Sequence, residues 1–516
     1  MIERPVLLYY ALALLAGAAY PLAFAPYEVW PVAIASSVIL LVCLNRTTLL
    51  NTFGILLFFG IGKYSIGASW TYDGLITLGD IAPSLATGLV SVFVLFYSLF
   101  FAFILTAVKF WIGVTIPQFR RSQHLAIRSL PFCAGWLVFE QANYVTALDT
   151  SFPWLDIGYA FTDTWLAGFA TLGGITLVSA GALVVAVGLL MIASMPRLSV
   201  VLVGLPWFAG LLALQQEWTV VNEDVNVALV QANVSIKEKY SEDGLGLAWS
   251  THVDLSRSAV EADLVIWPEG ALPIAEHQAR EYIQSLAKYL DTTILTGVYI
   301  RDDDRGSQKA YNGAVSVEPV GDTSQFLKFK RVPFGEYTPL EWLFEPIQSG
   351  MNIPNSNIKA GPARQSPLEL DCCKVGMSIC YEIAFPYLIG RRVHNTEFLV
   401  AISEDGWFGN SMGPAQHMQI ARMRAIETQR YVVRVTSSGL TGIVDPKGKL
   451  VAVLPVNEPG VLTSTIEKRT GSTPFMFIAG IVEGIFDGFY LLGLMLTAAC
   501  VALVARARQN RATSQV

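Results

Sequence analysis

The sequence predicts a multi-pass α-helical membrane domain into which a soluble α/β domain is inserted. Three observations support this fold class. Only 17 of the 76 charged residues lie in the first 220 positions of the 516-residue chain. Those positions contain a series of apolar stretches long enough to cross a bilayer, which takes about 20 residues. Beyond position 220, short β-rich runs instead alternate with helical stretches, as in an α/β domain.

The composition excludes several classes of protein. Charged residues make up 15% of the chain, against about 25% in soluble domains, and the mean hydropathy is +0.47. These values exclude a cytosolic enzyme, a disordered chain and a small secreted module. The net charge of −6 gives no support for nucleic-acid binding. Six cysteines in a chain of this length do not form a disulfide framework.

The apolar stretches predict seven spans before the soluble segment and one after it. They are Val6–Ala25, Val29–Leu44, Leu49–Trp70, Leu85–Val108, Leu130–Ala147, Leu172–Met195, Leu198–Leu214 and Gly488–Ala505. The first could be mistaken for a signal peptide, because Ala23-Phe24-Ala25 is typical of a cleavage site. Pro26 and the six spans that follow favour an uncleaved anchor instead.

Basic residues predict the orientation of these spans, because short cytoplasmic loops are enriched in Lys and Arg. They occur in alternate loops and at both ends of the chain, and the loops between carry acids. The basic residues are Arg4, Arg46, Lys109, Arg120, Arg121, Arg128, Arg197, Arg506, Arg508 and Arg511. Both termini are therefore expected in the cytoplasm. The soluble segment is expected on the other side, which is the periplasm of a bacterium with two membranes.

Two ionisable residues fall within predicted spans, Lys63 and Glu140. Charges inside a membrane are usually functional or paired. Since both lie in the outer half of a span, their side chains could instead extend to the nearby interface. The sequence leaves these two interpretations equally open.

The soluble segment, from about Val221 to Glu467, carries the pattern of an α/β domain. Strands are predicted at Val225–Gln231, Asp263–Trp267, Thr293–Ile300, Ala314–Glu318, Val375–Ile379, Phe398–Ser403, Val432–Thr436 and Leu440–Val444, and helices at Pro273–Leu290 and Pro414–Tyr431. No GxGxxG or Walker A motif follows a strand, and the five histidines lack metal-ligand spacing. No cofactor and no metal are therefore predicted. His417 is expected to be a satisfied polar residue rather than a base.

Cys380 is the candidate nucleophile. It follows the predicted strand Val375–Ile379, and a helix running toward Arg391 is expected to begin there. A helix N-terminus near a thiol favours the thiolate. An isolated buried cysteine is more often a small apolar residue, as expected for Cys372 and Cys373.

Two further strand ends supply the groups that a thiol nucleophile needs. Glu269 ends the apolar run before Gly270, and could remove the thiol proton. Lys328 and Lys330 precede a Pro-Phe-Gly-Glu turn, and an ammonium there could stabilise a tetrahedral adduct. These two lysines are expected on one strand face, so the pattern alone does not choose between them.

Three motifs, in their order along the chain, resemble those of the nitrilase superfamily, whose Glu-Lys-Cys sites lie on an α-β-β-α sandwich. They are Trp267-Pro268-Glu269-Gly270, Lys328 with Pro333-Phe334-Gly335-Glu336, and Ile379-Cys380-Tyr381-Glu382. The membrane frame and two further motifs narrow this resemblance, over essentially the whole chain, to the apolipoprotein N-acyltransferase family of the bacterial inner membrane. The further motifs are Phe152-Pro153-Trp154-Leu155 and Asp405-Gly406-Trp407-Phe408-Gly409 followed by Gly413-Pro414 and Gln416-His417.

The resemblance implies a role for each matched residue. Cys380 would be the nucleophile, Glu269 the base and Lys328 the oxyanion partner. Supporting or substrate-contacting roles would fall to Glu336, Tyr381, Glu382, Trp407 and Tyr240. The family register, five residues before the Pro of Pro-Phe-Gly-Glu, selects Lys328 over Lys330.

The chain also departs from the family pattern. Phe326 and Lys330 stand where Tyr and His are usual. Tyr240 stands where some members have Trp, and Glu404 where Asn is common. These departures affect local substrate contacts rather than the chemistry.

The expected organisation is a membrane domain over residues 1–220, a catalytic domain over 221–467, and a last span with a cytoplasmic tail over 468–516. The family implies a monomer that moves an acyl chain from a phospholipid, through a Cys thioester, to the α-amine of a diacylglyceryl apolipoprotein. A membrane-anchored nitrilase-type amidase fits the three residues equally well, but one span would suffice to tether it. A transporter or sensor is the non-enzymatic alternative. An odd block of seven spans followed by one is not typical of the matching halves of transporters.

Overall fold

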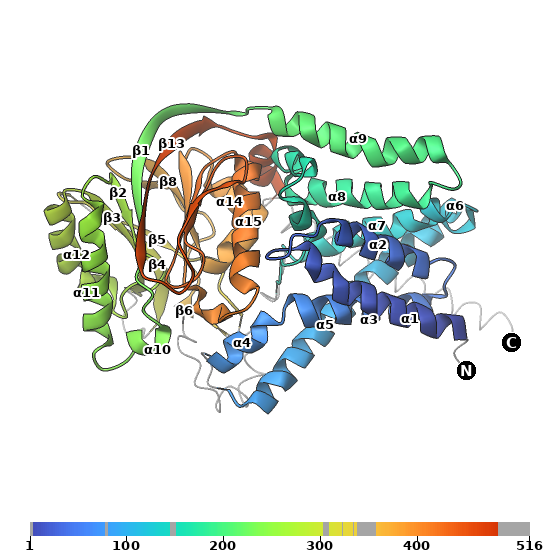
Figure 1. The fold of residues 1–516 in the computed structure, drawn as a ribbon, viewed down its shortest axis with the longest axis horizontal. Coiled ribbons are helices and arrows are strands. Elements are labelled where there is room, and N and C mark those ends of the chain that lie inside the picture. Colours follow the sequence, from blue (N-terminus) through green and yellow to red (C-terminus); the bar gives the residue numbers. More distant parts are fainter. Residues whose placement is uncertain are drawn as a thin grey trace, which may run out of the picture.

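The computed structural model describes residues 4–77, 81–144, 151–302, 309–321, 323–333, 335–337 and 358–482. A bundle of helices lies on one side and a two-sheet body on the other (Figure 1). The chain leaves the bundle from helix α9 (Pro196–Gln215) into strand β1 (Thr219–Gln231) and returns along β13 (Gly460–Gly471). The predicted last span, Gly488–Ala505, lies outside the described residues.

Five described helical segments are long and apolar enough to cross a membrane: Val6–Ala23, Leu49–Gly67, Pro83–Thr115, Trp165–Leu190 and Pro196–Gln215. The helices of this region are α1 Arg4–Ala19, α2 Pro31–Cys43, α3 Leu49–Gly67, α4 Trp70–Thr77, α5 Pro83–Thr115, α6 Pro117–Arg121, α7 Leu125–Ala142, α8 Ala170–Leu190 and α9. Helices α2 and α7 are not among these five segments. Helix α2 has only 13 residues, and helix α7 carries the charged residues Arg128 and Glu140. Proline fits the first turn of α2, α5 and α9 because it needs no N–H partner there.

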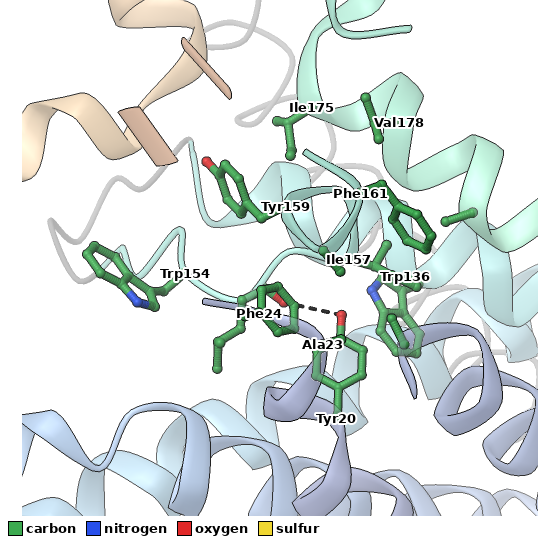
Figure 2. Close-up of a cluster of buried hydrophobic side chains, with 14 of the residues drawn as sticks. Tyr20, Ala23, Phe24, Trp136, Trp154, Ile157, Tyr159, Phe161, Ile175 and Val178 are labelled. Atoms are coloured by element: carbon green, nitrogen blue, oxygen red, sulfur yellow. Dashed lines mark hydrogen bonds between the residues drawn. The ribbon is translucent and has the colours of Figure 1, made fainter. Parts of the chain in front are cut away.

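One of the two interpretations expected the side chains of Lys63 and Glu140 to extend to the interface, and the structure shows that they do not. Both are buried inside the bundle, with 0% and 1% of their surface exposed. Glu140 accepts hydrogen bonds from Trp136 Nε1 and from the backbone N–H of Ile157, both at 2.9 Å. The Lys63 ammonium lies 5.0–5.9 Å from the ring centroids of Tyr20, Tyr64, Phe101, Trp136 and Phe139. Figure 2 shows Tyr20, Trp136 and Ile157 in this packed region.

The first sheet has the strand order β13-β1-β2-β3-β4-β5, with β6 beside β4. Its further strands are β2 Leu264–Ile266, β3 Thr293–Arg301, β4 Ala310–Val317, β5 Thr323–Leu327 and β6 Ile358–Lys359. Strands β1, β2 and β3 run parallel, so their carboxyl ends meet at one edge. Helices α11 (Gly244–Ser256) and α12 (Glu276–Leu290) pack on the outer face through an apolar cluster that includes Ala248, Ile283 and Val265.

The second sheet has the order β12-β11-β10-β9-β8-β7. Its strands are β7 Leu368–Glu369, β8 Lys374–Ile379, β9 Phe398–Ser403, β10 Val432–Thr436, β11 Gly442–Val444 and β12 Leu450–Val453. Apolar side chains of both sheets, among them Val227 and Val400, form the core between them. Helices α14 (Pro386–Arg392) and α15 (Gly413–Thr428) cover the face of the second sheet that points away from the first. The result is the α-β-β-α sandwich that the resemblance to the nitrilase superfamily implied (Figure 1).

The sandwich and the membrane helices share one continuous buried cluster, in which α14 and α15 are the middle layer. Polar contacts reinforce this junction. Trp154 Nε1 donates to Gln416 Oε1 at 2.7 Å, and the N–H of Ile175 in α8 donates to Glu427 at 2.7 Å. Figure 2 shows Trp154 and Ile175 within the cluster of buried side chains. The sandwich is therefore held directly against the apolar helices.

Most predicted strands match the structure, but one long strand was not predicted. Strands β9 and β10 have the predicted bounds. The helix predicted to begin at Pro273 begins at Glu276, and the helix predicted to end at Tyr431 ends at Thr428. Strand β13 pairs antiparallel with β1 along its length. It lacks a clear apolar alternation because most of its side chains are partly exposed.

Candidate active site

Cys380 lies at a sharp turn directly after β8. Its φ of 53° is in the left-handed region, which non-glycine residues rarely adopt. Such strain is typical of functional turns. The prediction of an α-helix starting at Cys380 is wrong: a 3₁₀ turn spans Cys380–Ala384, and α14 begins only at Pro386. Proline needs no N–H partner at that first turn, whereas it would break a helix continuing from Cys380.

Glu269 follows β2 and is held by three donors. Its Oε1 accepts from Asn312 Nδ2 at 2.6 Å and from Lys328 Nζ at 3.2 Å, and its Oε2 accepts from the N–H of Glu404 at 2.8 Å. Gly270, the next residue, has a φ of 55°, which allows the chain to turn away sharply. The carboxylate is thus fixed at the carboxyl edge of the first sheet, and 7% of the residue's surface is exposed.

Lys328, rather than Lys330, faces Glu269. Lys328 is 1% exposed, and its ammonium also lies 3.0 Å from Glu336 Oε1. The expectation that both lysines alternate onto one strand face is wrong, since β5 ends at Leu327. Lys330 is half-buried, with its ammonium 5.3 Å from the ring centroids of Phe329 and Phe385.

Glu336 and Asn312 complete a buried polar network around the ammonium. Asn312 Nδ2 donates to Glu336 Oε1 at 2.7 Å as well as to Glu269, and the N–H of Val332 donates to Glu336 Oε2 at 2.8 Å. Two carboxylates therefore share one ammonium and one amide. Sequence reasoning missed Asn312. The signal for it was an amide in the otherwise largely apolar β4, where a buried polar group must find partners.

Glu382 connects the Cys380 turn to the segment that carries Lys328. Its carboxylate accepts from the N–H groups of Ile379, Phe329 and Lys330 at 2.8–3.1 Å. Arg392 contacts both oxygens, at 2.7 and 2.8 Å. Burial alone would raise the pKa of Glu382, but the guanidinium of Arg392 and the N–H donors outweigh it and lower the pKa.

The electrostatics of Cys380 overturn the expectation of a resting thiolate. Burial raises the pKa of the Cys380 thiol, the charge of Glu269 raises it further, and Lys328 offsets this only in part. Burial also disfavours the ammonium of Lys328, but Glu269 and Glu336 outweigh burial and raise the pKa of Lys328. The site therefore holds a neutral thiol beside a permanent cation.

His417 is a satisfied polar residue, in agreement with the sequence expectation. With its proton on Nε2, it donates to the carbonyl of Cys380 at 3.3 Å and accepts from Arg434 at Nδ1, at 3.0 Å. Arg434 also pairs with Asp405 at 2.7 Å. Burial and the charge of Arg434 lower the pKa of His417, so it is neutral. This group contacts the backbone of Cys380 rather than its sulfur.

The other predicted supporting residues are Tyr381, Trp407 and Tyr240, and each contacts a different part of the fold. The Tyr381 hydroxyl donates to the carbonyl of Ser151, in the segment between α7 and α8. The carbonyl of Trp407 lies against α4, where a Cβ on Gly74 would approach it to 2.8 Å. Tyr240 is 49% exposed and donates to the Tyr299 hydroxyl at 3.3 Å. The structure thus brings Glu269 and Glu336 into direct contact with Lys328, and Cys380 into the electrostatic field of Glu269 and Lys328.

Comparison with known proteins identifies the family of the chain. The family model of the carbon-nitrogen hydrolases matches residues 226–475, and the model of the apolipoprotein N-acyltransferase N-terminal domain matches residues 16–190. The apolipoprotein N-acyltransferase of Azotobacter vinelandii is 34% identical over 480 residues, which cover 90% of each chain. The chain belongs to the apolipoprotein N-acyltransferase family.

Another apolipoprotein N-acyltransferase, from Coxiella burnetii, is 33% identical over 90% of this chain and 95% of its own. A solved CN-hydrolase superfamily protein from Xanthomonas campestris covers 48% of this chain and 91% of its own, at 18% identity and a TM-score of 0.35. The assignment to the apolipoprotein N-acyltransferase family rests on the sequence relatives and family models. Both halves of the fold, the apolar helices and the hydrolase-type sandwich, are matched by a family model.

Proposed function

We propose that this protein transfers an acyl chain from a membrane phospholipid to the α-amine of a diacylglyceryl cysteine at the N-terminus of apolipoproteins. The observation that carries the proposal is a buried thiol in the electrostatic field of Glu269 and Lys328, next to apolar helices. The names of the family relatives supply the apolipoprotein acceptor and the transferred acyl group, and the family resemblance implies the phospholipid donor. Cys380 is the nucleophile, Glu269 the base and Lys328 the oxyanion partner.

In the first half-reaction, Glu269 accepts the proton of the Cys380 thiol, and the sulfur attacks an ester carbonyl of the phospholipid. The negative charge moves to the carbonyl oxygen, where the Lys328 ammonium stabilises it. The C–O bond then breaks. The leaving oxygen of the lysophospholipid takes the proton back from Glu269, and a thioester remains on Cys380. A base is required because the resting thiol is neutral.

In the second half-reaction, the α-amine of the apolipoprotein attacks the thioester carbonyl and Glu269 accepts a proton from that amine. The C–S bond breaks, an amide forms, and the proton returns to the sulfur. The amide is far more stable than the thioester, so the transfer runs toward product. Two lipid substrates also explain a membrane-embedded enzyme, since each buried CH₂ contributes about 0.8 kcal/mol to membrane retention.

The proposed topology has seven spans before the catalytic domain and one after it, with both termini in the cytoplasm. Catalysis then takes place at the periplasmic surface of the bacterial inner membrane. The proposed domains are residues 1–220, 221–467 and 468–516, and the proposed working unit is a monomer. The distribution of Arg and Lys among the loops supports the orientation.

A two-substrate assay tests this function. The purified protein is incubated with phospholipid labelled in the acyl chain and with a diacylglyceryl peptide bearing a free α-amine; a matched peptide with an acetylated amine is the control. Label should appear in the free-amine peptide alone, and Cys380→Ala should abolish it. Turnover of small soluble amides without lipid transfer would favour an anchored amidase. Unchanged cellular function of Cys380→Ala would favour a transporter or sensor.

A further inference from the structure

A buried ion pair outside the three reacting residues lies beside the proposed base. Lys239 is the last residue of the short helix α10 (Ile236–Lys239), and Glu404 directly follows β9. Their charged atoms are 2.8 Å apart, and the two side chains are 3% and 10% exposed. A buried pair of this kind is costly to break, because the remaining charge has no compensation.

Both members of the pair are connected to Glu269 through the backbone. Lys239 Nζ donates to the carbonyl of Gly270, the residue after Glu269, at 2.9 Å. The N–H of Glu404 donates to Glu269 Oε2 at 2.8 Å. The second oxygen of Glu404 accepts from the N–H of Gly406 at 3.2 Å, which fixes the turn after β9. The pair therefore holds the base from the chain segments on two sides.

We propose that Lys239 and Glu404 are positioning residues for Glu269, which hold its carboxylate in the geometry that proton transfer from the thiol requires. This inference rests on the proposed role of Glu269 as base. The pair contacts Glu269 only through backbone groups, so its geometric effect is to hold the carboxylate where the thiol can reach it. A displacement of about 1 Å in such a group can cost about a hundredfold in rate.

The pH profile of the reaction reports on this placement, because titratable groups surround Glu269. They are Lys328, Glu336, Cys380 and Tyr299, and the charged pair Lys239 and Glu404 is connected to it through the backbone. A nearby cation favours a carboxylate and a nearby anion disfavours it. Removing the Lys239 charge should move the acidic limb of the acylation rate to higher pH. Removing the Glu404 charge should move it to lower pH.

The experiment measures acylation of the full-length protein by labelled phospholipid as a function of pH. Lys239→Met should lower the rate at pH 7 by about tenfold to a hundredfold and shift the acidic midpoint upward. Glu404→Gln should shift that midpoint downward, and the double variant should lie between the two. The matched controls are Lys237→Met on the same helix and Glu242→Gln nearby, both exposed, which should leave the midpoint unchanged.

Opposite shifts distinguish positioning of the base from a merely structural role, which would lower the thermal midpoint without moving the two pH profiles apart. Shifts in the same direction, or shifts no larger than those of the controls, overturn the inference. If Lys239→Met does not fold, Glu404→Gln carries the test, and an unmoved acidic midpoint overturns it. If wild type forms no acyl-enzyme, the proposed function itself has failed, and this outcome is visible before any variant is compared.

Discussion

The Glu382–Arg392 pair should be the most sensitive structural element around Cys380. The perturbation is Arg392→Met, which removes a cation bonded to both oxygens of a carboxylate that is 0% exposed. The Glu382 carboxylate would keep its three backbone N–H donors but would lose its counter-ion. Breaking a buried pair in this way costs about 3–5 kcal/mol. In a domain of this size each kcal/mol lowers the thermal midpoint by about 2–4 °C, so a loss of about 6–20 °C is expected.

The pH dependence of this loss identifies its cause. In wild type the pKa of Glu382 is lowered on folding, so the pair stabilises the protein above the ordinary carboxyl pKa and loses that contribution as the pH falls. Without Arg392, burial dominates and the pKa of Glu382 should be raised instead. The variant's deficit should therefore be largest near pH 8 and smaller near pH 5, where the carboxyl is protonated.

The assay is thermal unfolding of both proteins in the same detergent at pH 5 and pH 8. Arg391→Met is the matched control, because Arg391 is adjacent but donates to a backbone carbonyl, that of Ala363, rather than to Glu382. At pH 8 that variant should lose less stability than Arg392→Met, because it leaves the Glu382–Arg392 pair intact. An Arg392→Met deficit of the same size at both pH values, or one no larger than that of Arg391→Met, would refute the reasoning.

Two further predictions concern charge placement. Lys328→Met should reduce acyl-enzyme formation by about a hundredfold or more. Lys330→Met should reduce it by less than about tenfold, since the Lys330 ammonium contacts aromatic rings rather than Glu269. Equal losses in the two variants would contradict the assignment of Lys328 as the oxyanion partner. Burial raises the pKa of Glu427 to about 7, so its ionisation should destabilise the wild type as the pH rises from the ordinary carboxyl pKa, about 4.3, to about 7. Glu427→Gln should remove this part of the pH dependence of the thermal midpoint, and an identical profile in the two proteins would count against it.

The sequence predicted the fold well where each element carries its own signal. Strands β9 and β10 are uninterrupted apolar runs, so their bounds were predictable. Strand β13 is partly exposed and mixed in composition, and only its pairing with β1 defines it. Proline at position 386 marks the real helix start, but the 3₁₀ turn before it depends on the strained φ of Cys380.

The site was predictable as residue types but not as an electrostatic state. The motifs named Glu269, Cys380 and the pair Lys328 and Lys330, and the resemblance selected Lys328 and added Glu336 and Glu382. The protonation of the thiol could not be read from the motif, because it depends on burial and on a carboxylate more than a hundred residues away. Asn312 and Lys239 escaped notice for the same reason: their partners are brought to them only by the folded sheets.

The most direct test of the central claim is the covalent state of Cys380 after exposure to phospholipid alone. Wild type and Cys380→Ser are incubated with a phospholipid of defined acyl chain, and intact-mass analysis is followed by peptide mapping. Wild type should gain the mass of one acyl chain on the peptide that contains Cys380, and hydroxylamine should remove it as expected for a thioester. Cys380→Ser should gain no hydroxylamine-sensitive acyl chain. An equal acyl gain in both proteins, or its location on another residue, would contradict the account.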